Sequence, residues 1–96
     1  LFDVASTSSG QCWSITTYCP VPGPVPTSPA NNGYKPGFAA ELMLKDLSLA
    51  QEAARATGVP TPLGAEAMQL YQLFVANGNA GVDFSGIIEF IRGKSK

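Results

Sequence analysis

The chain contains no histidine and only two cysteines, and charged residues make up just 14% of its 96 positions. Without histidine it can form neither a zinc site with His ligands nor a catalytic triad that uses a His base of its own. Cys12 and Cys19 are too few to hold a disulfide scaffold together. We therefore expect no metal site, and the small disulfide-rich class of proteins is excluded.

Strong charge of either sign and long apolar runs are also missing. The net charge is −1 and the six lysines and arginines are scattered, so bulk electrostatics give no reason to bind nucleic acid or an anionic membrane. No run approaches the roughly 18 apolar residues of a membrane-spanning helix, and no secretory or transit signature is present. Because the chain opens on Leu1-Phe2-Asp3-Val4, without an initiator methionine, we expect it to be a piece of a longer protein.

What the chain does have is an apolar content of 45%, enough for the modest core of one small domain. Leu1 and Val4 follow the spacing of one helical face, and Gly10 is expected to end that first short helix. A second helix over residues 12–18 would hold the two cysteines about 10 Å apart along its axis, too far for a disulfide. An irregular loop would let them meet, so the state of the thiols stays open.

Residues 20–37 hold six of the eight prolines. Proline removes amide donors and fixes φ, so this segment predicts an extended, partly polyproline-like connection without helix or central strand. A loop of this length is often functional, although a plain surface strap explains the composition equally well.

Helical patterns fill the remainder of the chain. Residues 38–57 are mostly good helix formers, and Gly58 is an expected stop. Pro62 suits the start of the next helix, which should end near Asn77 and Gly78, and Asp83 is a plausible N-cap for a last helix. Because no convincing strand period appears, we predict an all-α fold with a long proline-rich loop.

Two charged residues depart from the amphipathic pattern of residues 38–57. On a helical wheel one broad apolar arc holds Leu42, Leu49, Ala53, Ala39, Ala50, Met43, Ala54 and Leu47, and the opposite polar face holds Glu41, Ser48, Gln51, Glu52 and Arg55. Asp46 falls within the apolar arc and Lys45 at its border. Asp46 could cap or pair inside the protein, or face a polar cleft. For Lys45, periodicity alone favours a surface pair with Glu41 at i, i+4; the alternative is a cation offered to an anionic ligand or a hydroxyl.

Several short motifs occur in order along nearly the whole chain. They are SSGQCWS at residues 8–14, YCPVPG at 18–23, GF at 37–38, LMLKDLSLAQ at 42–51, PLG at 62–64 and DFS at 83–85. The sharpest is KDLSLAQE at 45–52, which is fairly specific when Gly-Phe and Leu-Met precede it. Together they resemble the C-terminal domain of the 3-hydroxyisobutyrate dehydrogenases, which belong to the β-hydroxyacid dehydrogenase family and are related to 6-phosphogluconate dehydrogenase.

The resemblance implies a fold, a cofactor and site residues. The family joins an N-terminal Rossmann domain, which binds NAD, to an all-helical C-terminal domain of the 6-phosphogluconate-dehydrogenase-like type, with the active site between them. By this resemblance Lys45 contacts NAD, Asp46 supports the active site, and Tyr18, Phe38 and Trp13 line the substrate pocket. The Rossmann domain and the helix with the catalytic lysine are absent from residues 1–96, so this chain should not turn over substrate by itself.

The implied reaction is the oxidation of 3-hydroxyisobutyrate to methylmalonate semialdehyde, a step of valine catabolism, by a homo-oligomeric enzyme. Bacterial relatives are cytoplasmic and eukaryotic ones mitochondrial, and we favour the bacterial cytoplasm. Lys45 and Asp46 would then project past the helical core into the cleft closed by the other domain. The competing interpretation is a non-catalytic helical dimerisation module with a proline strap.

Overall fold

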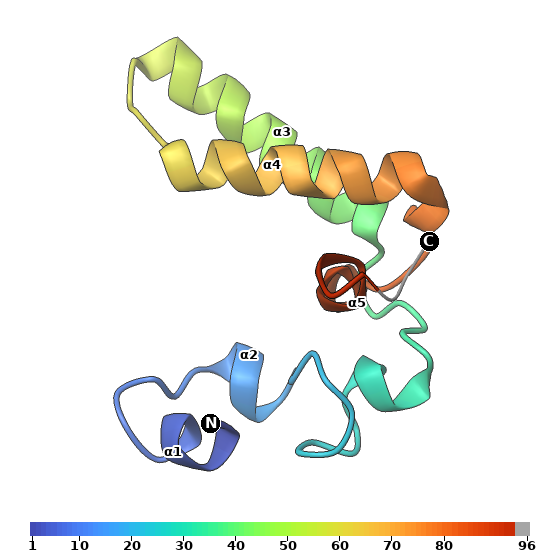
Figure 1. The fold of residues 1–96 in the computed structure, drawn as a ribbon. Coiled ribbons are helices and arrows are strands. Elements are labelled where there is room, and N and C mark those ends of the chain that lie inside the picture. The colour runs from blue at the N-terminus through green and yellow to red at the C-terminus, as the bar shows by residue number, and fades with distance from the viewer. Residues whose placement is uncertain (94–96) are drawn as a thin grey trace.

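The computed structural model describes residues 1–93, which fold into helices joined by turns (Figure 1). In chain order the elements are α1 (Phe2–Ser6), α2 (Trp13–Thr16), η1 (Pro29–Asn32), α3 (Ala40–Thr57), α4 (Pro62–Phe74), η2 (Val75–Asn79), η3 (Phe84–Gly86) and α5 (Ile87–Ile91). Over these residues the sole β-type contact is an isolated antiparallel bridge between Ala39 and Asp83. The all-α prediction is confirmed.

An antiparallel pair of helices, α3 and α4, forms the main body of the molecule (Figure 1). Gly58 ends α3 in the left-handed conformation, with φ of 72°, a geometry that glycine adopts without strain. Pro62 stands in the first turn of α4, where its missing amide costs nothing. The short connection is fastened by the Gln51 amide, which donates to the Thr61 hydroxyl over 3.0 Å. Both predicted ends are correct.

Helix α3 begins two residues later than predicted because the residues before it pair with the segment before η3. The Phe84 amide donates to the Phe38 carbonyl and the Ala40 amide to the Val82 carbonyl, each over 2.8 Å. Ala39 between them is extended, with φ of −64° and ψ of 146°. This pairing fixes where α3 starts relative to the last third of the chain.

One face of α3 packs inside the molecule and the opposite face is open. The half-buried side chains follow helical spacing and are Met43, Leu44, Leu47, Ser48, Gln51 and Ala54. Ser48 and Gln51 were expected on the outer, polar face, and this prediction is wrong. Ser48 is accommodated because its hydroxyl donates to the Leu44 carbonyl over 2.8 Å. Leu42 and Leu49 instead lie on the open face, 45% and 53% exposed.

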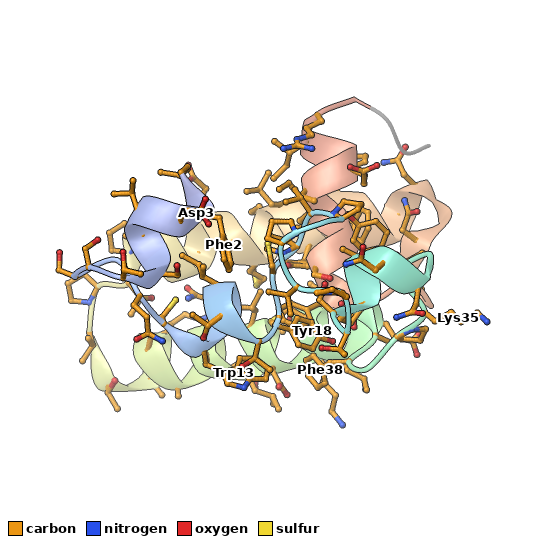
Figure 2. The ribbon with its side chains drawn as sticks, turned by 90° about the horizontal axis from the view of Figure 1, so that it is seen from below. Phe2, Asp3, Trp13, Tyr18, Lys35 and Phe38 are labelled. Atoms are coloured by element: carbon orange, nitrogen blue, oxygen red, sulfur yellow. The ribbon has the colours of Figure 1, made fainter. Side chains whose placement is uncertain are left out.

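The N-terminal helices α1 and α2 pack against each other (Figure 2). Helix α1 ends at Ser6 with Thr7 as its C-cap, so the expected glycine end at Gly10 is wrong. The hydroxyl of Thr7 takes over part of that role by donating to the Asp3 carbonyl over 2.9 Å. Both cysteines are free thiols, Cys12 exposed and Cys19 buried, which answers the question left open above.

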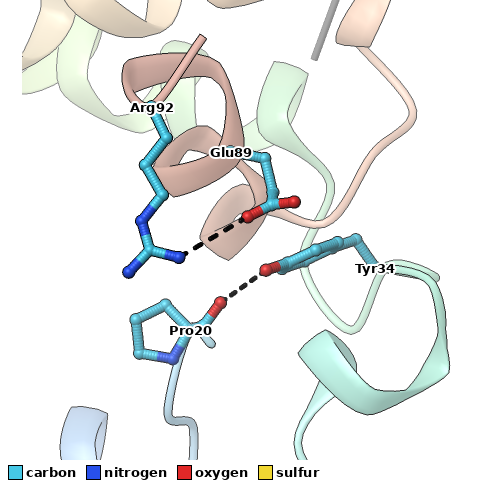
Figure 3. A network of polar contacts seen from close by, with 4 residues as sticks. All are labelled: Pro20, Tyr34, Glu89 and Arg92. Atoms are coloured by element: carbon cyan, nitrogen blue, oxygen red, sulfur yellow. Dashed lines mark hydrogen bonds and ion pairs between the residues drawn. The ribbon is translucent and has the colours of Figure 1, made fainter. Parts of the chain in front are cut away.

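The proline-rich segment is folded back on itself rather than extended. The Tyr34 hydroxyl donates to the Pro20 carbonyl over 2.6 Å. Figure 3 shows this bond beside the ion pair between Glu89 of α5 and Arg92, the C-cap of that helix. Inside this closed loop the Asn31 side chain donates to the Val25 carbonyl over 2.8 Å. The predicted polyproline-like extension is wrong, because these side chains supply the turn-forming bonds that the prolines cannot donate.

The core is small and centres on Phe74, which is completely buried. Tyr71 and Phe90 meet it edge to face, with ring centroids 6.3 and 5.5 Å away. Helix α4 ends at this residue, and the predicted stop near Asn77 and Gly78 falls inside η2, where both leave helical geometry. Phe74 therefore links α4 to the last helix.

We expect Phe74→Ala to lower the free energy of unfolding by about 3–5 kcal/mol, because it opens a cavity between α4 and α5. Gln72→Ala, an exposed change two residues earlier on the same helix, should stay within about 0.5 kcal/mol of the parent. Urea unfolding of the intact protein measures both. Equal values for the two variants would contradict the assignment of Phe74 to the core.

Candidate functional site

The buried carboxylate of Asp83 joins three separate segments of the chain. It is 0% exposed, and its Oδ1 accepts the Tyr18 hydroxyl over 2.5 Å, the Gly37 amide over 2.8 Å and the Phe38 amide over 3.0 Å. A buried carboxylate is costly unless donors surround it, and here they come from either side of the proline-rich loop. Asp83 therefore holds both ends of this loop.

The second oxygen of the same carboxylate serves the last helices. Asp83 Oδ2 accepts the Ser85 amide over 3.0 Å and the Ser85 hydroxyl over 2.5 Å, which confirms the predicted N-cap. Burial by itself would raise the pKa of Asp83, but the hydrogen bonds from Ser85 and Tyr18 outweigh it and lower this pKa below its ordinary value. The group is held as a carboxylate.

An aromatic wall, made of Trp13, Tyr18, Phe84 and Phe38, stands beside this carboxylate. Tyr18 stacks between Trp13 and Phe84, with centroids 5.1 and 5.2 Å away, and Phe38 meets Phe84 edge to face at 5.8 Å. In Figure 2 the labelled Trp13, Tyr18 and Phe38 lie together, so the three residues predicted for the substrate pocket share one site. Burial first, and then the bond to Asp83, raise the pKa of Tyr18, which keeps its proton.

Lys45 and Asp46 are exposed on the open face of α3. At about 100° per residue they flank the strip formed by Leu42 and Leu49. Between residues 1 and 93 neither side chain has an ion pair or a hydrogen bond, so the expected surface pair with Glu41 does not form. In the described part of the chain Asp46 caps no helix, and it is exposed rather than enclosed by the core. Both side chains are free to meet a group from outside this chain.

The aromatic wall and the charged pair belong to the same end of α3. Phe38 stands just before the helix, and Lys45 lies five residues beyond Ala40, about 7–8 Å along the axis at 1.5 Å per residue. An exposed ammonium next to exposed leucines fits a dinucleotide, whose hydroxyl and phosphate oxygens accept hydrogen bonds and whose rings are apolar. This donor set is compatible with NAD.

Three residues of this site escaped the sequence reasoning. Asp83 was identified only as a helix cap, Gly37 and Phe84 only as parts of motifs. A Cβ on Gly37 would lie 2.7 Å from the Tyr18 hydroxyl oxygen, closer than side chains tolerate. The DFS motif was the available signal for Asp83, but it indicates the local cap and not the contact with a tyrosine 65 residues away.

Other kinds of site find no support between Leu1 and Gly93. There, no three His, Cys, Asp or Glu side chains gather as metal ligands would. No helix in the described part of the chain has the length and apolar character needed to cross a membrane.

A family model described as "NAD-binding of NADP-dependent 3-hydroxyisobutyrate dehydrogenase" matches residues 1–91. The chain belongs to this family. The match takes in the aromatic wall, Lys45, Asp46 and Asp83, so the whole candidate site lies inside it.

Known proteins resemble the chain in sequence and in structure. It is 53% identical over 95 residues to the "Probable 3-hydroxyisobutyrate dehydrogenase" of Mycobacterium tuberculosis strain H37Rv and 45% identical over 92 residues to the mitochondrial 3-hydroxyisobutyrate dehydrogenase of Homo sapiens. These matches cover 99% and 96% of this chain but only 32% and 27% of the relatives. A solved structure titled as the Mycobacterium tuberculosis enzyme with L-serine superimposes with a TM-score of 0.90 at 54% identity, covering 95% of this chain and 31% of that one.

We expect Asp83 to make the stability of the protein sensitive to acid. Because its pKa is lowered on folding, its contribution is present above its ordinary pKa of 3.8 and is lost as the pH falls through the lower folded value. The free energy of unfolding of the parent should therefore exceed that of Asp83→Asn by less at about pH 3 than at pH 7.

Urea unfolding at several pH values measures this difference. Glu52→Gln, which removes an exposed carboxylate of α3, is the control and should give a small difference at every pH. A gap between the parent and Asp83→Asn that stayed constant down to pH 3 would contradict the expectation.

Proposed function

We propose that this chain is the C-terminal helical part of an NAD-dependent dehydrogenase that oxidises 3-hydroxyisobutyrate to methylmalonate semialdehyde, a step of valine catabolism. The observation that carries the proposal is the 53% identity over 99% of the chain to a probable 3-hydroxyisobutyrate dehydrogenase. The chain spans about a third of that relative. The remaining two thirds would supply an N-terminal Rossmann domain and the catalytic lysine.

Lys45 is the proposed cofactor contact. Its ammonium is exposed, and within the described residues it has no anionic partner to compete for it. An ammonium in this position donates to hydroxyl or phosphate oxygens of a dinucleotide and neutralises part of its charge. NAD, when bound, accepts the hydride that the hydroxyl-bearing carbon of the substrate loses.

Asp46 and the apolar strip of Leu42 and Leu49 are the proposed surface that closes the cleft. Leucines that stay 45% and 53% exposed in this chain gain free energy when another domain covers them. Water excluded by that closure no longer screens the charges of Lys45 and Asp46. In this role Asp46 supports the active site electrostatically and orients donors of the other domain.

The aromatic wall is the proposed boundary of the substrate pocket. Tyr18 and Phe38 are half-buried, and Trp13 is 57% exposed, so the wall has free surface on which a ligand can lie. Ring faces pack against the carbon chain of a small β-hydroxyacid, while polar recognition comes from the few donors and acceptors at the edge of the wall.

We also propose that the protein forms a homo-oligomer and lies in the bacterial cytoplasm. Three leucines of α4, Leu63, Leu70 and Leu73, are 81%, 37% and 52% exposed, which supports a homo-oligomer with this face covered. The higher identity to the mycobacterial protein than to the mitochondrial one supports a bacterial cytoplasmic enzyme. The same leucines favour the second candidate, a non-catalytic dimerisation module.

Turnover separates the two candidates. We expect the intact protein to reduce NAD when given 3-hydroxyisobutyrate, with L-serine and 3-hydroxypropionate as weaker substrates and NADP offered in parallel. Absorbance of the reduced cofactor measures the rate. A protein that dimerises through this region but reduces neither cofactor with any of the three hydroxyacids would be the interaction module.

We expect Lys45→Ala in the intact enzyme to raise KM for NAD about tenfold, because a charged hydrogen bond contributes about 1.5–3 kcal/mol. Lys35→Ala is the matched control: Lys35 is also exposed but lies in the proline-rich loop and not on α3, so its removal should change KM less than about twofold. Unchanged KM for NAD and unchanged kcat in Lys45→Ala would refute the assignment.

A further inference from the structure

We propose that Asp83 is a positioning residue for the substrate pocket, acting through Tyr18 and Phe38 rather than by touching the ligand. This inference rests on the proposed function, because it takes the aromatic wall as the side on which the hydroxyacid binds.

The two oxygens of Asp83 bind different parts of the molecule: Oδ1 accepts hydrogen bonds from the segments that carry the aromatic wall, and Oδ2 accepts them from the start of the last helices. Oδ1 accepts three donors, the Tyr18 hydroxyl and the amides of Gly37 and Phe38, and two of these three residues carry rings of the wall. Among the described residues, Oδ2 accepts only from the amide and hydroxyl of Ser85. A residue that served merely as a helix cap would need Oδ2 alone.

Gly37 makes the arrangement tight. A Cβ at this position would stand 2.7 Å from the Tyr18 oxygen and 3.7 Å from Asp83 Oδ1. Its φ lies outside the left-handed region, so the need for glycine comes from the close approach of the tyrosine and not from backbone conformation. Any larger residue at position 37 would therefore block the approach of the Tyr18 hydroxyl to the Asp83 carboxylate.

The bond to Asp83 also decides what Tyr18 can offer a ligand. A phenol has one proton, and this one is donated to Oδ1. Trp13 and Phe84 stack on the two faces of its ring, so Tyr18 can offer a ligand its ring edge but no hydrogen-bond donor. A ligand carboxylate is therefore disfavoured beside Tyr18, because this hydroxyl has no proton left to donate to it.

Tyr18→Phe and Ser85→Ala test this as a matched pair, since each removes one hydroxyl that donates to Asp83 over 2.5 Å. In the intact protein Tyr18→Phe should raise KM for 3-hydroxyisobutyrate about fivefold or more, with KM for NAD and the pH profile of kcat unchanged. Ser85→Ala should change each KM less than about twofold, although it should lower the melting temperature about as much as Tyr18→Phe does.

Asp83 itself is tested by conservative rescue. Asp83→Asn keeps an oxygen that can accept from Tyr18, whereas Asp83→Ala keeps none. We expect KM for the hydroxyacid to rise in Asp83→Ala and to lie nearer the parent value in Asp83→Asn.

A second measurement reads the wall without turnover. Trp13 is the single tryptophan of this chain and stacks on Tyr18, so its collisional quenching by acrylamide reports how firmly the wall is held. In the intact protein, the Trp13 signal is obtained by subtraction: the fluorescence of each variant minus the fluorescence of the same variant that also carries Trp13→Phe. Quenching should rise in Tyr18→Phe and Asp83→Ala and stay unchanged in Ser85→Ala.

Equal changes in Tyr18→Phe and Ser85→Ala, in KM and in quenching, would reduce Asp83 to a helix cap and overturn the inference. If the intact protein does not oxidise 3-hydroxyisobutyrate, the proposed function fails, and the quenching comparison alone decides whether Asp83 positions the wall. Quenching that rises in Tyr18→Phe and Asp83→Ala but not in Ser85→Ala would then support the positioning role. An equal rise in all three variants would overturn it.

Discussion

The arrangement of this chain depends on one buried carboxylate and the five hydrogen bonds that surround it. Asp83 meets Tyr18, Gly37, Phe38 and Ser85 with no solvent exposure. Removing such a group leaves all of these donors without their acceptor, and for the buried Ser85 donors this penalty exceeds the benefit of any single bond. The aromatic wall, the start of α3 and the cap of the last helices are therefore not independent features. Each is fastened to the same two oxygen atoms, so a change in one is felt by the others.

Local signals in the sequence predicted the parts of the fold that depend on neighbouring residues. Gly58 and Pro62 marked the turn between α3 and α4, and the aspartate at position 83 marked an N-cap, because each acts within a few residues of its position. The proline-rich loop was misjudged for the opposite reason. Its turns come from side chains such as Asn31 and Tyr34 that reach across 6 and 14 residues, and no local pattern announces such bonds.

The sequence pattern also predicted the wrong buried face for α3. The wheel assigned Leu42 and Leu49 to the core and Ser48 to solvent, yet these leucines are exposed and Ser48 is half-buried. A wheel measures which face is apolar but not what covers it. The resemblance supplied the missing condition, a second domain that would meet this face, and the exposed positions of Lys45 and Asp46 agree with it. The roles of the individual site residues came from the resemblance alone, because neither composition nor spacing distinguishes a cofactor contact from a solvated lysine.

The separation along the chain of the Asp83 contacts bears on the order in which the protein folds. Helices α3 and α4 are joined by a four-residue turn and can pair as soon as they form, since closing a short loop loses little chain entropy. The bonds from Asp83 to Tyr18 and to Gly37 bridge 65 and 46 residues, so closing them loses less chain entropy once that hairpin exists. The substrate wall would thus be among the last regions to acquire its native structure, and the same long closures would make it open first under mild denaturant, while the hairpin persists.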